Sequence, residues 1–159
     1  MKDRLSDRVA RGLFIAAAVL MLVINALPLI ESGYLSSGQM LEVMHGWEIW
    51  LSVIPSLIDF HNMSFQSKGP DFAWVLGAAV VLGSPFLVRQ LSVSRVLWWS
   101  LLVASALVIL GLTGVLGWMF VVDPSYGEFF RFRIGIVFVL TYPLVHFAGV
   151  LCVRKRILK

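Results

Sequence analysis

Residues 96–122 read VLWWSLLVASALVILGLTGVLGWMFVV, and this stretch contains no Asp, Glu, Lys or Arg. A transmembrane helix needs about 20 consecutive apolar residues to cross a hydrocarbon core that is about 30 Å thick. The stretch exceeds that length, so a helix made from it can tilt or extend beyond the core. It therefore predicts a membrane-spanning helix and places the chain among integral membrane proteins.

Three further apolar stretches, at 12–30, 72–88 and 134–153, also lack charged residues. The composition agrees with four spans: 59% of the 159 residues are hydrophobic and only 14% are charged, whereas roughly a quarter are charged in a soluble domain. We expect an all-α fold, an integral membrane four-helix bundle that forms one domain over residues 1–159. An outer loop at 31–71 would connect the first two spans.

The basic residues predict the orientation, because cytoplasmic loops carry an excess of Lys and Arg. One side of the predicted bundle carries Lys2, Arg4, Arg8, Arg11, Arg89, Arg95, Arg154, Lys155, Arg156 and Lys159. The other side carries Lys68, Arg131 and Arg133. We therefore expect both termini in the cytoplasm, and the membrane to be the bacterial cytoplasmic (inner) membrane.

Charge and cysteine content exclude two classes of protein. The pI of about 9.6 suggests a nucleic-acid binder, but the basic residues flank apolar segments and form no recognition face. Cys152 is the only cysteine. It cannot form an internal disulfide, so the membrane thiol oxidases that need paired cysteines are excluded as well.

The outer loop contains a pattern typical of an amphipathic helix. On a helical wheel, one arc holds Met40, Val43, Met44, Trp47, Trp50, Leu51 and Ile54. The opposite side holds Glu42, His45, Glu48 and Ser52, and Pro55 would end or bend the helix. We expect an additional interfacial helix with Trp47 and Trp50 at headgroup depth. A fifth crossing is the competing interpretation, but it would bury three ionisable side chains.

His146 lies inside the fourth predicted span, where an ionisable residue suggests a function. It is the one candidate for cofactor binding, as a haem ligand. The other two histidines, His45 and His61, lie on the outer side and at a different depth. We therefore expect no haem, and we interpret His146 as a neutral histidine that hydrogen-bonds a neighbouring helix.

The outer loop also contains residue types that bind metals, with His45, Glu48 and His61 as the candidate ligands. On a helix, Glu42, His45 and Glu48 would spread over about 120°, which is wide for one ion. Such residues are equally what the wet face of an interfacial helix requires. We expect a solvated face, with no metal and no other cofactor.

Small and polar residues inside the spans suggest helix packing. Gly111, Gly114 and Gly117 recur every three residues in the third span and would let another backbone approach closely. The intramembrane polar residues Asn25, Ser84, Thr113 and Thr141 could join helices by hydrogen bonds. We expect the glycines, together with Trp47 and Trp50, to mediate helix packing or contact with a partner.

The four-span plan with a large first outer loop is similar to that of claudins and other tetraspan proteins. The string Gly46-Trp47-Glu48-Ile49-Trp50 lies in this loop, where the claudin signature has a Trp-Gly-Leu-Trp-type motif and two cysteines. The loop contains no cysteine. The similarity therefore extends to the overall plan only, and we infer no family from it.

These observations favour a small non-enzymatic membrane protein that acts by association. It would be an accessory subunit of a membrane complex or a homo-oligomer, with the bilayer and a membrane protein as partners and no nucleic acid. A channel or small-solute transporter is one alternative, although no span contains the carboxylate that proton-coupled carriers usually need. A redox or lipid-modifying enzyme is the second, without a nucleophile–base pattern in the sequence.

Overall fold

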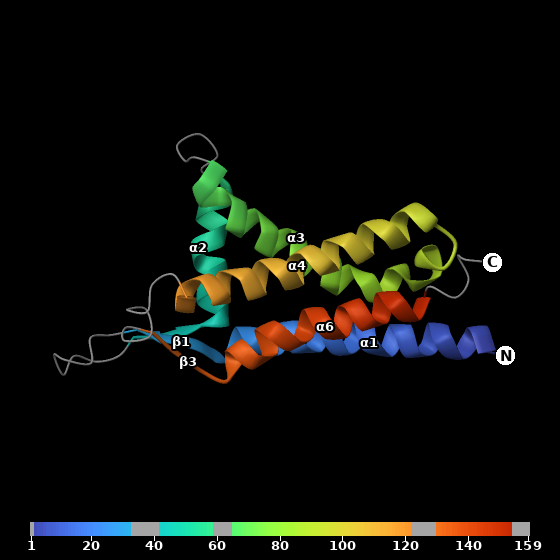
Figure 1. Cartoon of the computed structure of the whole chain (residues 1–159), viewed down its shortest axis with the longest axis horizontal. Coiled ribbons are helices and arrows are strands. Elements are labelled where there is room, and N and C mark those ends of the chain that lie inside the picture. The colour runs from blue at the N-terminus through green and yellow to red at the C-terminus, as the bar shows by residue number, and fades with distance from the viewer. Residues whose placement is uncertain (1, 33–41, 59–64, 122–129, 154–159) are drawn as a thin grey trace.

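The computed structural model describes residues 2–32, 42–58, 65–121 and 130–153, and most of them are helical (Figure 1). In chain order, the elements are α1 (Lys2–Ala26), β1 (Pro28–Ser32), β2 (Glu42–His45), α2 (Gly46–Ile58), α3 (Phe65–Leu91), α4 (Arg95–Val121), β3 (Phe130–Phe132) and α6 (Gly135–Val153). The all-α prediction is therefore confirmed for the body of the molecule. A small sheet is the exception.

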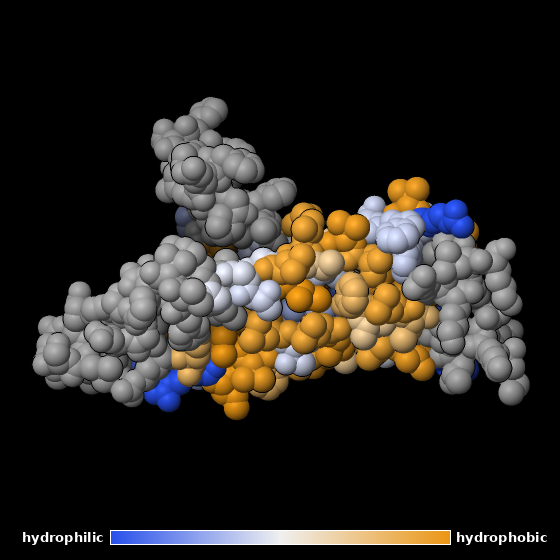
Figure 2. Space-filling view, in the orientation of Figure 1, coloured by the Kyte–Doolittle hydropathy of each residue, from blue (hydrophilic) through white to orange (hydrophobic). Residues whose placement is uncertain are grey.

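Within the described residues, three helices contain a stretch long and apolar enough to cross a membrane: Trp74–Leu91 in α3, Arg95–Gly114 in α4 and Gly135–Val153 in α6. They coincide with the second, third and fourth predicted spans. On the face shown in Figure 2, apolar residues form a band over the middle of the molecule, with hydrophilic residues toward its ends. The first predicted span, now in α1, is not among the three, and its apolar run lies between Arg11 and Asn25.

Helices α1 and α6 run side by side and antiparallel along the long axis of the molecule (Figure 1). Gly149 of α6 makes this close approach possible. A Cβ added at Gly149 would lie 2.8 Å from a ring carbon of Phe14, so a larger residue would push the helices apart. Small residues at such contacts are typical of helices in membranes, where van der Waals packing drives association.

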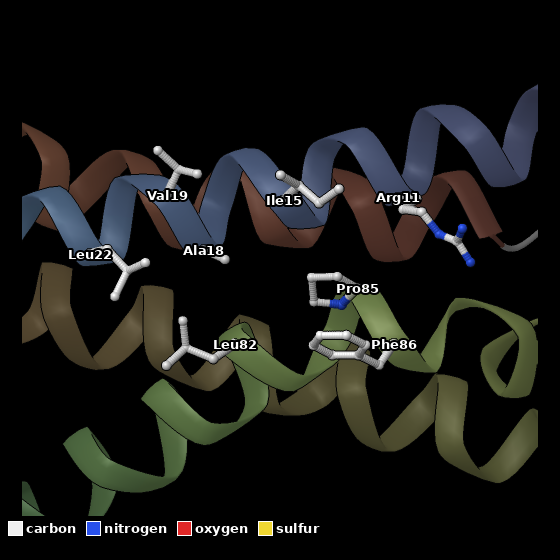
Figure 3. Close-up of a pocket in the computed structure, with 8 residues that line it drawn as sticks. All are labelled: Arg11, Ile15, Ala18, Val19, Leu22, Leu82, Pro85 and Phe86. Carbon is white, nitrogen blue, oxygen red and sulfur yellow. The ribbon is translucent and has the colours of Figure 1, made fainter.

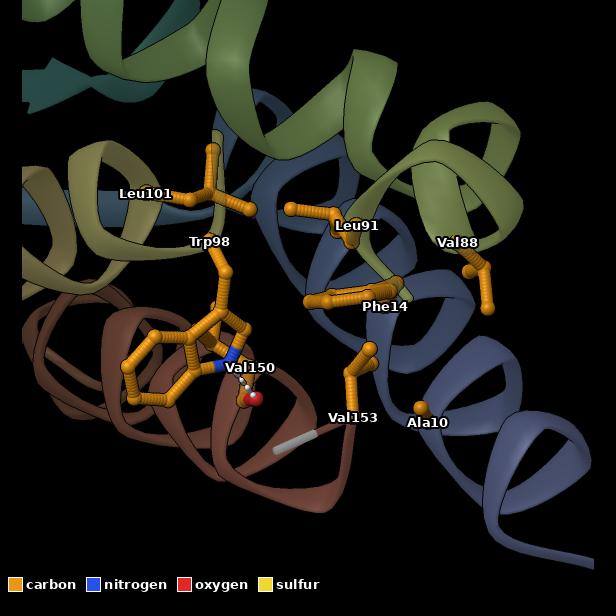
Figure 4. Packing of buried hydrophobic residues seen from close by; sticks show 8 residues of the cluster. All are labelled: Ala10, Phe14, Val88, Leu91, Trp98, Leu101, Val150 and Val153. Atoms are coloured by element: carbon orange, nitrogen blue, oxygen red, sulfur yellow. Dashed lines mark hydrogen bonds between the residues drawn. The ribbon is translucent and has the colours of Figure 1, made fainter. Parts of the chain in front are cut away.

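All four long helices meet where α3 turns into α4 (Figure 4). The buried cluster there consists of Ala10, Phe14, Val88, Leu91, Trp98, Leu101, Val150 and Val153. The indole N–H of Trp98 donates to the backbone carbonyl of Val150 at 2.9 Å. That carbonyl lies in the last turn of α6, where no further N–H of the helix is available. The bond therefore joins α4 to the end of α6 and satisfies a buried carbonyl in the last turn of that helix.

Three short strands form an antiparallel sheet at the other end of the bundle, in the order β2-β1-β3. In the centre of the sheet, Glu31 pairs with Val43 on one side and with Arg131 on the other. The prediction of helix as far as residue 30, with no strand, was wrong. Helix α1 ends at Ala26 because Pro28 disfavours a helical conformation in the residue before it. The residues that follow pair with distant backbone instead.

Helix α2 lies across the long axis of the bundle, close to the sheet (Figure 1). The predicted helix began near residue 40, whereas the observed one begins at Gly46 because Glu42–His45 pairs with β1. The Glu48 carboxylate accepts a hydrogen bond from the backbone N–H of His45 at 3.2 Å. In a capping box, the side chain of the third helical residue makes this bond to the residue that precedes the helix. Pro55, predicted to end or bend the helix, lies within it.

Replacing Gly46 with alanine should destabilise the fold, because the start of α2 contacts the end of α1. The new Cβ would overlap the backbone oxygen of Ile24, and a backbone atom cannot rotate away. We expect a loss of about 1–3 kcal/mol or more in the free energy of unfolding, measured by equilibrium denaturation in mixed micelles. Gly12→Ala, where an added Cβ meets nothing within 4 Å, is the control. Equal stability of the two variants would contradict the contact.

Candidate functional site

A buried polar cluster joins three helices in the middle of the bundle. His146 of α6 is 1% exposed, and Ser84 of α3 and Ser105 of α4 are buried with it. The ring Nε2 lies 2.7 Å from Ser84 Oγ, and the ring Nδ1 lies 2.8 Å from Ser105 Oγ. The Phe14 ring of α1 packs against the imidazole, with 5.1 Å between ring centroids. Side chains of all four long helices therefore meet at His146.

The number of protons in this cluster restricts its hydrogen bonds. Each serine hydroxyl also lies within bonding distance of the carbonyl four residues earlier: Ser84 of Val80 at 2.5 Å, and Ser105 of Leu101 at 2.8 Å. A neutral imidazole has one N–H and one bare nitrogen. It donates to one serine, and the other serine must donate to the ring instead of to its carbonyl. The tautomer of His146 therefore decides which serine bonds to its own helix.

The surroundings of His146 suit a structural role better than the haem ligation considered from the sequence. A haem ligand needs a free ring nitrogen, and both nitrogens here have a serine hydroxyl as partner. His45 belongs to the sheet at one end of the bundle, and His61 lies outside the described residues. The 2.7 Å Ser84–His146 distance is within the range of a nucleophile and its base, but the solvent-exposed surface that a substrate would need is lacking at all three side chains.

The candidate metal ligands do not converge in the described part of the chain. There, no three His, Cys, Asp or Glu side chains come together in a metal-binding group. The carboxylate of Glu48 caps α2, and its second oxygen lies 3.7 Å from Nδ1 of His45. Because Glu42–His45 is a strand, the three-residue spacing assumed for one helix face does not apply. His61 lies outside the described residues, so its assignment as a candidate ligand stays a prediction.

The two tryptophans predicted at the interface have different surroundings. Trp50 faces inward: its indole N–H donates to Asn25 Oδ1 at 2.7 Å, and its ring meets that of Trp74 edge-on at 6.2 Å. Asn25 in turn donates to the Met21 carbonyl of its own helix. These contacts join α2 to α1 and α3. Trp47 is 48% exposed, so it remains available for a contact outside the chain.

An ion pair at the sheet was not predicted from the sequence. Glu31 in β1 is 6% exposed, and both its carboxylate oxygens lie 2.5 Å from Nη2 of Arg133. The backbone N–H of Arg133 also donates to the Leu29 carbonyl at 2.9 Å. Glu31 was expected at the start of the outer loop. An acidic residue directly after an apolar run was a local signal, but its partner lies 102 residues away.

The exposed face of α4 contains the three glycines that the sequence singled out. A Cβ added at Gly111, Gly114 or Gly117 would meet nothing within 4 Å. Leu107 and Leu110 on the same face are more than 60% exposed. The described chain does not pack on this face, so the expected contact with another molecule stays a prediction. The glycines that do pack closely, such as Gly149, were not singled out from the sequence.

The intramembrane polar residues also divide into two groups. Ser84 and Asn25 connect helices, as described above. Thr113 and Thr141 instead donate to carbonyls of their own helices, Ile109 at 2.8 Å and Val137 at 2.6 Å. Back-bonding of this kind satisfies a hydroxyl without any neighbour. Residue type alone did not distinguish the two groups.

The Ser84–His146 bond predicts a strongly non-additive pair of substitutions. Ser84→Ala leaves a buried ring nitrogen without a partner, which should cost about 1–3 kcal/mol of unfolding free energy. In a His146→Leu background the same change should cost much less, because leucine has no ring nitrogen that could lose its partner. Equilibrium unfolding in mixed micelles measures both, with Thr113→Ala as a control that should change stability by less than about 0.5 kcal/mol. Equal losses in the two backgrounds would show that the bond has no energetic role.

Comparisons of the chain with family models, with curated proteins and with solved structures found no match. The conclusions about function therefore depend on the geometry and on physical chemistry.

Proposed function

We propose that the chain is an integral membrane protein with four crossings, and that it works by association with another membrane protein or with a second copy of itself. The observation that carries this proposal is the exposed face of α4. Three glycines and several large apolar side chains lie on it, and no described part of the chain covers it. In a bilayer, such a face suits close contact with another helix.

The crossing by α1 has support from its neighbours. It lies against α6 along the bundle (Figure 1), and α6 is long and apolar enough to span. Its exposed residues between 12 and 24 include Ile15, Val19, Leu22 and Val23, which suit contact with lipid. Arg8 and Arg11 precede this run, as expected for a cytoplasmic end.

The orientation of α2 supports the proposed interfacial helix. It lies across the bundle axis (Figure 1) and would therefore run along the membrane surface if the long helices cross. Trp47, Leu51 and Ile54 lie on its exposed side at helical spacing and are each roughly half exposed or more. We propose that this face enters the outer headgroup region, where tryptophan is favoured.

The topology is tested with single cysteines in a Cys152→Ser background, probed by a membrane-impermeant thiol reagent on intact cells. We expect labelling of Met44→Cys in β2 but not of Arg8→Cys in α1 or Val93→Cys in the α3–α4 turn, all at exposed positions. All three should react after permeabilisation. Positions 8 and 44 on the same side would show that α1 does not cross.

The association is tested by native mass spectrometry of the intact particle purified in mild detergent. We expect wild-type particles heavier than one chain, with additional copies or a stoichiometric partner. Gly114→Leu should reduce them to single chains, because the larger side chain would prevent close approach on the α4 face. Gly12→Leu, at an exposed and equally open position on α1, is the matched control. A single-chain wild-type particle, or an unchanged Gly114→Leu particle, would contradict the proposal.

A further inference from the structure

An apolar groove of about 490 Å³ runs between α1 and α3 on the surface of the bundle (Figure 3). Its walls include Arg11, Ala18, Leu22, Leu82, Pro85 and Phe86. In Figure 3, Ala18 and Leu22 point toward α3, while Leu82 and Pro85 point back toward α1. Phe86 is 82% exposed at the mouth. The groove therefore opens sideways, toward the surroundings of the bundle.

One charged group lies at one end of this groove. Figure 3 shows the guanidinium of Arg11 turned into the gap between the two helices, and the other walls carry hydrocarbon side chains. Among the described residues, none of those that line the groove is acidic. The groove therefore matches a ligand that has a long apolar part and an anionic group at one end.

The dimensions of the groove suit a single hydrocarbon chain. From Arg11 to Leu22 the α1 axis rises about 16 Å, and one leaflet of a hydrocarbon core is about 15 Å deep. The length of the groove therefore matches the depth over which one acyl chain extends in a leaflet.

We infer that this groove is a binding site for one anionic phospholipid of the cytoplasmic leaflet. One acyl chain lies along Ala18, Leu22 and Leu82, and the phosphate binds the guanidinium of Arg11. This inference rests on the proposed crossing of α1, which places Arg11 at headgroup depth. Guanidinium donates two parallel hydrogen bonds to phosphate oxygens. In a zwitterionic lipid the headgroup's own cation competes for the phosphate, so the site prefers a lipid with net negative charge.

The test uses the full-length, delipidated protein titrated with phosphatidylglycerol or phosphatidylethanolamine of identical acyl chains, followed by native mass spectrometry. We expect one phosphatidylglycerol to bind more tightly than the first phosphatidylethanolamine. Arg11→Gln should weaken phosphatidylglycerol binding about tenfold, as expected for the loss of one charge-assisted contact, and should leave phosphatidylethanolamine binding unchanged. Arg8→Gln, at an exposed position one turn away and outside the groove, should retain the preference.

A second pair of variants tests the position of the acyl chain. Ala18→Trp should fill the groove and weaken the binding of both lipids, whereas Ala16→Trp, at an exposed position of α1 that does not line the groove, should leave binding intact. Equal affinity for the two lipids, or a preference for phosphatidylglycerol that persists in Arg11→Gln, would overturn the inference. Because Arg11 is exposed, its variant tests the inference even if Ala18→Trp fails to fold. Cysteine labelling tests the crossing of α1 independently. If α1 crosses but the lipid preference does not depend on Arg11, only the lipid site is refuted.

Discussion

The close approach of distant segments to α1 and to the residues just after it is the contact on which the rest of the structure depends. Three glycines make it possible. Gly149 faces the Phe14 ring, Gly46 faces the backbone of Ile24, and Gly135 faces the backbone of Pro28. Each contact leaves no space for a Cβ. Through these contacts α1 positions α6, the start of α2 and the link between β3 and α6. The orientation of α2 across the bundle and the pairing of three strands at one end both follow from this arrangement.

Polar side chains add specific connections to this packing. In lipid, apolar helices gain little from burying one another, so interhelical hydrogen bonds and close contacts select the arrangement. His146 brings α3 and α4 to α6, and Trp50 connects α2 to Asn25. The Glu31–Arg133 pair holds the sheet together where the chain leaves the bundle.

The proposed functions use the surfaces that this arrangement leaves open. Gly46 and Gly149 pack against α1 and Gly135 packs against the residues just after it, whereas the glycines of α4 lie on its exposed side. The groove between α1 and α3 is also open, beside the exposed ring of Phe86. A helix partner and a lipid would therefore use different faces of the bundle. The proposed interfacial helix α2 would provide a third contact, with the outer surface of the membrane.

The sequence by itself determined that α3, α4 and α6 are long apolar helices, because hydropathy and helix length are properties of contiguous residues. It also directed attention to His146, because an ionisable side chain in an apolar run is a local anomaly. Only the tertiary structure decided that residues 28–32 and 42–45 are strands, since each strand exists through backbone partners that are distant in sequence. The partners of His146 and Glu31 could not be predicted for the same reason: they lie 41 to 102 residues away. Which glycines pack is likewise decided by the neighbour that each one meets, and that neighbour is determined by how the helices come together.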